Sequence, residues 1–302
     1  MSTSIGIGAV VSRSLQVRAK GGETSPRSLA FLAALWFCLL FALLFLVVLI
    51  VTTLIEGAPR LDARLFTEYP ASNPERAGAR PAIIGSLWVI GTTTLMAIPL
   101  GIAAAIHLEE FADKKSRINR VVELNVQNLA AIPSIVYGML TLAVLGILGI
   151  TNKNMVWVGA LALAMLILPV IIIATREALR AVPAEIRQGS LALGASPLQT
   201  VLRNTLPAAV PGIATGAILA LSRALGEAAP LLLLGGLVYL TFDPNGLASG
   251  YTVMPIQIFN WTGRPQEGFH VLAAATSILL LALLLAMNAL AIFIRNRYQQ
   301  RW

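Results

Sequence analysis

Residues 155–175 read MVWVGALALAMLILPVIIIAT, and this stretch decides the fold class. It contains no Asp, Glu, Lys or Arg. A helix needs about 20 mainly apolar residues to cross a hydrocarbon core of ~30 Å. We therefore expect residues 155–175 to form a membrane-spanning helix.

Five further stretches pass the same test and lie on either side of the first. They are residues 29–54, 82–108, 124–150, 208–240 and 269–294, and only 208–240 holds charged side chains. Because 57% of the chain is hydrophobic and 12% is charged, a soluble fold would leave large apolar surfaces exposed to water. The sequence predicts an all-α integral membrane protein with six transmembrane helices.

The predicted spans also set the domain boundaries. We expect an N-terminal tail over residues 1–28, a transmembrane domain over 29–294 and a C-terminal tail over 295–302. The apolar run 29–54 is longer than the h-region of a signal peptide, which has ~7 to 15 residues. It is therefore predicted to be a retained helix.

The net charge of +8 does not indicate a nucleic-acid partner, because the basic residues fall in short runs between apolar stretches. Lys and Arg are enriched in the cytoplasmic loops of membrane proteins. Most of them here lie on the side that carries both termini. We expect a multi-pass protein of the cytoplasmic (inner) membrane with both termini in the cytoplasm, although the loop 56–81 on the opposite side holds four arginines.

Residues suited to catalysis or cofactor binding are scarce. A phosphate-binding P-loop needs Gly followed by Lys, and the sequence contains no such pair. ATP and Mg²⁺ would therefore be bound by a separate ATPase chain. With Cys38, His107 and His270 as the whole set of cysteines and histidines, we expect no metal site and no catalytic site.

Residues 176–207 form the longest connection on the cytoplasmic side, and within it residues 181–207 read AVPAEIRQGSLALGASPLQTVLRNTLP. The segment is too polar to span a membrane and is predicted to be a short helix, a turn near 194–197 and a second helix. Gly194 permits the sharp turn, and the small side chains of Gly189 and Ser190 would allow the first helix to lie deep in a groove of a partner. The alternative is an ordinary surface helix-turn-helix.

Residues 219–234, LALSRALGEAAPLLLL, place charge inside the fifth predicted span. An arginine within a membrane helix costs ~2.5 to 3.5 kcal/mol on insertion scales, so it is usually paired or lines a watery path. Glu227 lies one helical turn from Arg223 on the same face. Either the two form an ion pair that only fixes helix packing, or Arg223 attracts an oxyanion while Glu227 tunes or gates the path.

A second pattern in the fifth span concerns packing. Gly212 and Gly216 form a GxxxG motif, which permits close contact between helices. Glycine is also common in membrane helices in general, and the sequence leaves these two explanations open.

Several strings resemble known transporters. Gln188-Gly189-Ser190, then Gly194, then Asn204-x-Leu206-Pro207 resemble the cytoplasmic EAA loop of ABC importer permeases. The strings SRALGEAAP (222–230), IPSIVYG (132–138), PIQIFNW (255–261) and RPQ (264–266) resemble phosphate importer permeases of the PstA type. Gln188-Gly189-Ser190 replaces the usual Glu-Ala-Ala, which puts in doubt any salt bridge to the ATPase.

The resemblance implies the type I ABC importer permease fold and an ATP-driven phosphate importer. It also implies a homologous PstC-type permease subunit, a cytoplasmic ATPase dimer and an extracytoplasmic phosphate-binding protein as partners. In such a transporter the loop at about 179–207 would couple ATP hydrolysis to alternating access. The residues expected to carry that coupling are Gln188, Gly189, Ser190, Gly194, Leu206 and Pro207.

Four charged residues are candidates for the substrate pathway. Arg223 would meet phosphate, with Glu227 beside it. Arg176 and Glu177 match in type the charged residues that family permeases carry just before the coupling loop, and they could equally be ordinary interfacial charges.

Two other functions stay open at this point. A permease for sulfate or molybdate would share the same architecture. A secondary transporter driven by an ion gradient would also hold buried charge, but inverted repeats and interrupted helices would then be expected.

Overall fold

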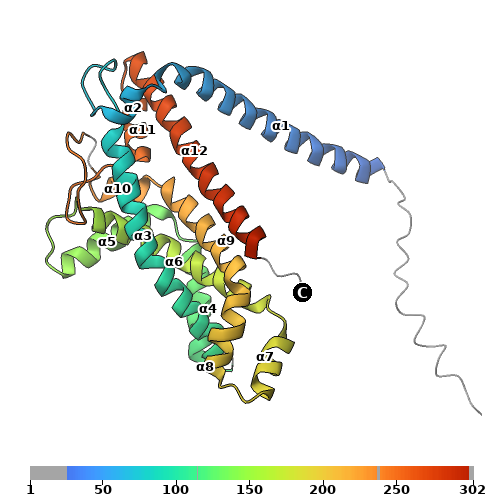
Figure 1. The fold of residues 1–302 in the computed structure, drawn as a ribbon. Coiled ribbons are helices and arrows are strands. Elements are labelled where there is room, and N and C mark those ends of the chain that lie inside the picture. The colour runs from blue at the N-terminus through green and yellow to red at the C-terminus, as the bar shows by residue number, and fades with distance from the viewer. Residues whose placement is uncertain (1–25, 114, 237–238, 299–302) are drawn as a thin grey trace, which may run out of the picture. The chain divides into compact units, whose positions relative to one another are not determined.

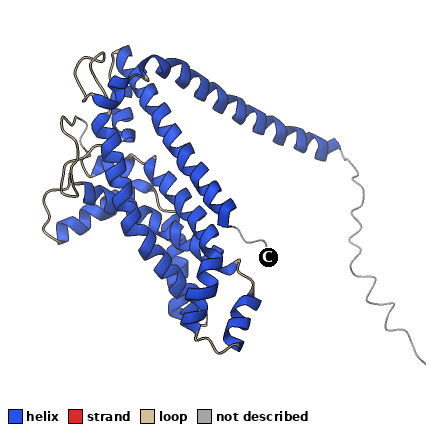
Figure 2. Cartoon of the chain, in the orientation of Figure 1, coloured by secondary structure: helices blue, strands red, loops and turns tan. Residues whose placement is uncertain are grey.

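The computed structural model describes residues 26–113, 115–236 and 239–298. Over these residues the chain forms helices joined by loops, without a strand (Figure 2). The chain divides into two compact units, Met1–Thr52 and Thr53–Trp302. The first unit contains most of α1 (Pro26–Gly57), an apolar helix that confirms the predicted span 29–54. The predicted tail 1–28 lies outside the described residues except for 26–28, which begin α1.

Four long helices organise the second unit: α3 (Arg80–Ile106), α6 (Val156–Arg180), α9 (Leu206–Leu225) and α12 (Glu267–Tyr298). The central one is α6, which packs against both α3 and α9. In its most apolar 18-residue stretch, 67% of the residues are buried. A helix that is apolar on every side needs neighbours or lipid around it. The α6 side chains Leu163, Ile167 and Ile171 are completely or almost completely buried in the main apolar core.

Shorter elements lie at the ends of the long helices and at breaks between them. Helices α2 and α11 lie at one end of the second unit, and α7 and α8 lie at the other (Figure 1). The π-helix η3 continues α3, and the π-helix η4 leads into α9. The short elements are η2 (Ala58–Arg60), α2 (Ala63–Thr67), η3 (His107–Phe111), α4 (Arg117–Ala130), α5 (Ser134–Ile147), α7 (Ala184–Ala192), α8 (Pro197–Thr200), η4 (Val201–Thr205), α10 (Ala229–Leu233) and α11 (Met254–Thr262).

Five helices of the described chain are long and apolar enough to cross a membrane, and a bent pair supplies a sixth if it counts as one span. This result confirms the all-α membrane fold. The bent pair is α4 and α5, which meet at an angle of 114° inside the predicted span 124–150. Pro133 lies at the bend, where its ring removes a backbone donor and disfavours helical geometry at the preceding residue.

The predicted boundaries of the fifth span, 208–240, are wrong. Helix α9 ends at Leu225, the chain leaves the helix over residues 226–228, and α10 lasts only from Ala229 to Leu233. The apolar span that contains α9 instead runs from Pro197 to Leu225. Gly226 and Pro230 explain the early end, because glycine weakens a helix and proline disfavours helical geometry just before it.

The C-terminal boundary also shifts. The last predicted span, 269–294, is confirmed as part of α12, but the helix continues to Tyr298, inside the predicted tail 295–302. Residues 299–302 of that tail lie outside the described residues.

Gly85 of α3 offers a test of this packing. A Cβ atom at position 85 would overlap the carbonyl oxygen of Thr252 in the segment before α11, whereas a Cβ at Gly91 on the same helix meets nothing within 4 Å. We expect Gly85→Ala to destabilise the protein by about 1 to 3 kcal/mol, in the range of other overpacked sites. Gly91→Ala should be neutral or slightly stabilising, because alanine favours helix.

The measurement is the temperature at which each purified variant loses its monodisperse elution peak in detergent. Equal temperatures for Gly85→Ala and Gly91→Ala would contradict the close approach of α3 to the segment around Thr252.

Candidate functional site

Arg223 lies in the last turn of α9, and Glu227 lies just beyond the end of the helix. The Arg223 Nε and Glu227 Oε1 atoms are 3.8 Å apart, and the two side chains are 46% and 21% exposed. This separation is too long for a hydrogen bond. Glu227 is the one ion-pair partner of Arg223 in the described part of the chain. The pair therefore exists, but only as a long ion pair.

The neighbour of Arg223 in sequence contacts α12. Ser222 donates a hydrogen bond to the amide oxygen of Asn288 on α12, at 3.1 Å. This bond joins α9 to α12 one residue before Arg223, which is exposed on another face of α9. On that face Leu219, one turn earlier, is also exposed.

Glu227 borders a small void that is lined by residues of α3, α6, α9 and α10 and by Val253 before α11. Its volume is about 10 Å³, which is close to the space that one water molecule occupies. A tetrahedral oxyanion does not fit there. Arg223 is not among the residues that line this void.

A second group of charges surrounds Arg176, and we call Glu109, Glu123, Arg176 and Arg180 the α6 ion cluster. Arg176 donates from Nε to Glu109 Oε2 at 3.2 Å and from Nη2 to Glu123 Oε1 at 2.9 Å, and its side chain is only 8% exposed. Arg180 Nη2 lies 3.0 Å from the same Glu109 oxygen. Each buried charge is thus compensated, as a buried ion requires.

The other residue predicted beside Arg176 has a different position. Glu177 points away from the cluster's centre, with its side chain 64% exposed and Oε1 3.0 Å from Arg180 Nη1. A cavity of about 240 Å³ adjoins the cluster. Arg176, Arg180 and Glu123 line it together with Asp113, Asn119 and Arg120.

Arg176 and Arg223 belong to separate sites. Helices α6 and α9 run antiparallel, since a Cβ on Gly212 would lie 2.8 Å from Ala178 and one on Gly216 would overlap Ala174. Of the two explanations that the sequence left open for Gly212 and Gly216, these contacts favour close packing between helices. Arg223 lies eleven residues beyond Gly212, which is about 16 Å further along α9 at 1.5 Å per residue.

The 179–207 loop has the predicted helix-turn-helix form. Helix α7 ends in a turn at Gly194, whose φ of 85° is the left-handed conformation that glycine adopts without strain. Helix α8 begins with a capping box. The Ser196 side chain accepts a hydrogen bond from the backbone N–H of Gln199, and the Gln199 side chain accepts one from the backbone N–H of Ser196. The chain then passes through η4 into α9, where Leu206 is half-buried and Pro207 is exposed in the first turn.

Ser190 joins the two arms of this loop. Its hydroxyl lies 2.9 Å from Thr200 Oγ1 and accepts a hydrogen bond from Asn204 Nδ2, also at 2.9 Å. Gln188 and Gly189 are exposed on α7, and a Cβ on Gly189 would meet nothing within 4 Å. Ser190 therefore stabilises the loop, while Gln188 and Gly189 face outward.

Sequence reasoning missed an apolar surface at the tip of this loop. Its members are exposed leucines outside the predicted spans, and Leu193 is the most exposed at 91%. They are Leu191, Leu193, Leu198 and Leu202. Clustered exposed apolar residues indicate a contact surface for another protein or for lipid, and their spacing around Gly194 was the available signal.

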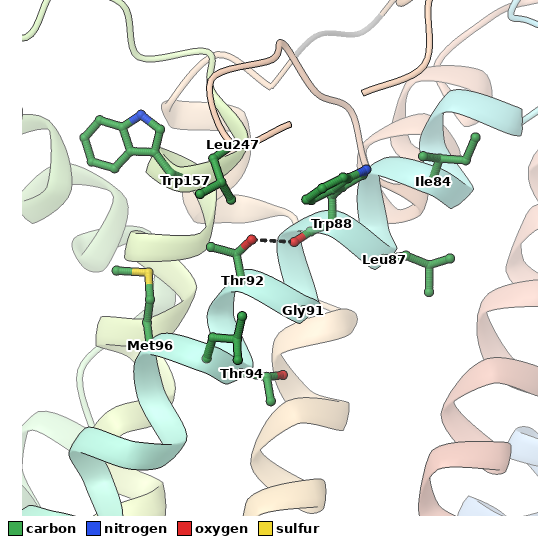
Figure 3. Close-up of a pocket in the computed structure, with 10 residues that line it drawn as sticks. Ile84, Leu87, Trp88, Gly91, Thr92, Thr94, Met96, Trp157 and Leu247 are labelled. Atoms are coloured by element: carbon green, nitrogen blue, oxygen red, sulfur yellow. Dashed lines mark hydrogen bonds between the residues drawn. The ribbon is translucent and has the colours of Figure 1, made fainter. Parts of the chain in front are cut away.

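Another cavity is of a different kind. It is an open groove of about 980 Å³ along α3, with Trp88, Trp157 and Leu247 among its lining residues (Figure 3). Among the described residues, the side chains that line it are apolar or hydroxyl-bearing. The groove suits hydrocarbon rather than an oxyanion.

Comparison with known proteins identifies the family. Residues 97–302 match the model of the "binding-protein-dependent transport system inner membrane component". This chain belongs to that family. The permease shares 31% identity with the phosphate transport system permease protein PstA of Pasteurella multocida, over 87% of this chain and 91% of the relative. Its identity with PstA of Yersinia pestis is 32%, over 86% and 88% of the two chains.

The fold of the permease is that of type I ABC importer permeases. A solved bacterial alginate ABC transporter, in complex with a pentasaccharide-bound periplasmic protein, contains a chain that matches with a TM-score of 0.67. The match covers 91% of this chain and 96% of the other at 17% identity. The resemblance to PstA-type permeases and the predicted fold class are both confirmed.

The Ser190 contacts give a prediction about the permease. Ser190→Ala removes two hydrogen bonds between the arms of the 179–207 loop, and each such bond contributes about 1 kcal/mol. Local opening should then become roughly 5- to 30-fold more frequent. We expect faster amide hydrogen exchange in α7, measured by mass spectrometry. Gln188→Ala, on the exposed face of the same helix, is the control and should leave the exchange unchanged; equal exchange in both variants would contradict the role of Ser190.

Proposed function

We propose that this permease is a membrane-spanning subunit of an ATP-driven importer of inorganic phosphate. The observation that carries the proposal is the Arg223 guanidinium, which lies at the end of a membrane helix, is nearly half exposed and has one distant carboxylate partner. The names of the PstA relatives support phosphate as the substrate. The family supports dependence on an external binding protein.

Arg223 and Glu227 have complementary roles in this proposal. A guanidinium offers a planar fork of N–H donors that matches two oxygens of a phosphate. Glu227 compensates Arg223 while no anion is bound, and it repels a bound anion once phosphate arrives. The resulting affinity is moderate, which a transport pathway requires because the ion must also leave.

The partners follow from what this chain lacks. The void beside Glu227 is too small for phosphate, so the remaining wall of the pathway comes from a second, homologous permease subunit of the PstC type. A cytoplasmic ATPase dimer binds ATP and Mg²⁺, and an extracytoplasmic phosphate-binding protein delivers the ion. Both termini then lie in the cytoplasm, on the same side of the inner membrane as the 179–207 loop.

The 179–207 loop is the docking element for the ATPase. Gln188 and Gly189 face outward on α7 and Gly194 sets the turn. Gln188 cannot form the salt bridge that Glu would make, and the exposed Leu193 and its neighbours provide apolar contact instead. Movement of the loop passes through Leu206 and Pro207 into α9, and α9 carries Arg223 at its far end. ATP-driven closure of the ATPase thereby drives alternating access.

Arg176 and Glu177 belong to the inner end of the pathway in this proposal. Arg176 is already paired with two carboxylates, so its attraction for a passing anion is weak. The adjoining cavity of about 240 Å³ provides room for phosphate, and the weak attraction there favours its release.

The role of Arg223 predicts a loss of transport. In the reconstituted complex, Arg223→Gln should lower phosphate uptake at least 100-fold, because losing a charge-assisted bidentate contact costs about 3 kcal/mol. Arg223→Lys keeps the charge without the fork and should retain partial activity. The control is Arg64→Gln, at an exposed arginine of α2. Normal phosphate uptake by Arg223→Gln would refute the assignment.

The rival functions need a separate experiment. Interrupted helices, expected for an ion-coupled transporter, do occur at residues 131–133 and 226–228, but the family is one of binding-protein-dependent transport. Purification of the permease from its host should recover an ATPase chain, and uptake should require ATP. Uptake driven by an ion gradient without ATP would contradict the proposal. Stronger competition by sulfate or molybdate than by phosphate would redirect it to another oxyanion.

A further inference from the structure

Arg187 of α7 makes the most extensive set of contacts of any arginine in the described chain. Its Nη2 donates to Glu110 Oε1 at 2.7 Å, and its Nε lies 3.2 and 3.3 Å from the two carboxylate oxygens. The same guanidinium donates to the backbone carbonyls of Leu179 at 2.7 Å and Val182 at 3.0 Å. One side chain thus ties α7 to η3 and to the end of α6. We call the contact between Arg187 and Glu110 the α7 clasp.

Glu110 is a firm attachment point. It lies in η3, which continues α3 without a break, and its side chain is only 10% exposed. The adjacent Glu109 points into the α6 ion cluster and already fastens this end of α3 to α6. The neighbouring glutamates therefore have different partners, and Glu110 is not needed to hold α3 against α6.

Helix α7, by contrast, depends on a few contacts. None of its residues is fully buried. Ile186 packs against an apolar cluster around Leu179 and Val182, and Ile102 and Ile106 of α3 pack against the same cluster. Ser190 joins α7 to the arm that leads into α9. Arg187 is the charged connection from α7 to the end of α3.

We propose that the α7 clasp is a second mechanical connection, through which displacement of α7 is transmitted to α3 as well as to α9. The inference rests on the proposed function, in which an ATPase displaces α7. Helix α9 follows α7 through the covalent chain and the Ser190 bonds. Helix α3 has no covalent continuity with α7, so a bidentate, partly buried ion pair supplies the connection. Both helices that flank α6 then move in one step.

Arg187 and Glu110 are positioning residues in this scheme, and neither touches the substrate. Their loss should separate ATP hydrolysis from transport rather than abolish assembly. The readout is therefore the number of phosphate ions moved per ATP hydrolysed, which a purely structural role would not change in an assembled complex.

Glu110→Gln is the deciding variant, because it removes the carboxylate charge and leaves Arg187 bonded to the Leu179 and Val182 carbonyls. In the complete complex reconstituted in liposomes, with the binding protein and phosphate present, we expect basal ATP hydrolysis within twofold of the unmodified protein. Phosphate moved per ATP should fall at least fivefold. Arg187→Gln should produce a similar fall, and the double variant should be no worse than the more severe single variant. Arg117→Gln, at an exposed arginine at the start of α4, is the control and should change neither quantity.

Two results would overturn the clasp. One is an unchanged ratio of phosphate to ATP in Glu110→Gln. The other is loss of ATPase co-purification in Glu110→Gln, which would make the contact structural. Failure of the proposed function is distinct, because the unmodified complex would then show no ATP-dependent phosphate uptake.

Discussion

A charge inside a membrane protein must be compensated, and this requirement determines where the ionisable groups of the permease lie. Arg176 is almost completely buried, and two carboxylates neutralise it at 2.9 and 3.2 Å. Arg223 is nearly half exposed, and its one carboxylate lies 3.8 Å away. The first arginine is fully satisfied by its own chain. The second is not, and this difference is the reason for proposing that Arg223, rather than Arg176, makes the main contact with the ion.

The same constraint explains where the helices break. Hydrocarbon cannot satisfy free backbone N–H and C=O groups, so irregular backbone at membrane depth must be packed within protein or line a cavity. The break at residues 226–228 lies between buried Leu225 and buried Pro230, beside the small void under α3. Glu227 lies within this break. The non-helical residues after α9 therefore supply both the change in chain direction and the carboxylate near Arg223.

Sequence patterns predicted what depends on local composition. Charge-free apolar stretches located the long helices, and Gly194 located the turn of the 179–207 loop. Gly212 and Gly216 indicated that a close helix contact was possible, but not that α6 is the partner. Hydropathy could not locate the end of α9, because the residues after Glu227 remain apolar although the helix has stopped. One partner of Arg176 is Glu109, 67 positions away, and no local pattern specifies such a pair. The sequence strings that resemble phosphate importer permeases identified the class of transporter, but they did not indicate the contact between Arg187 and Glu110.

In the proposed transporter, Arg223 faces a water-filled path rather than lipid. Reaction of Arg223→Cys with a negatively charged, membrane-impermeant thiol reagent tests this position most directly, in the assembled complex and in a Cys38→Ser background that removes the native thiol. We expect modification by the charged reagent, at a rate far above that of a lipid-facing cysteine on α12. Modification by lipid-soluble reagents alone would place the side chain against hydrocarbon and contradict a role in the ion path.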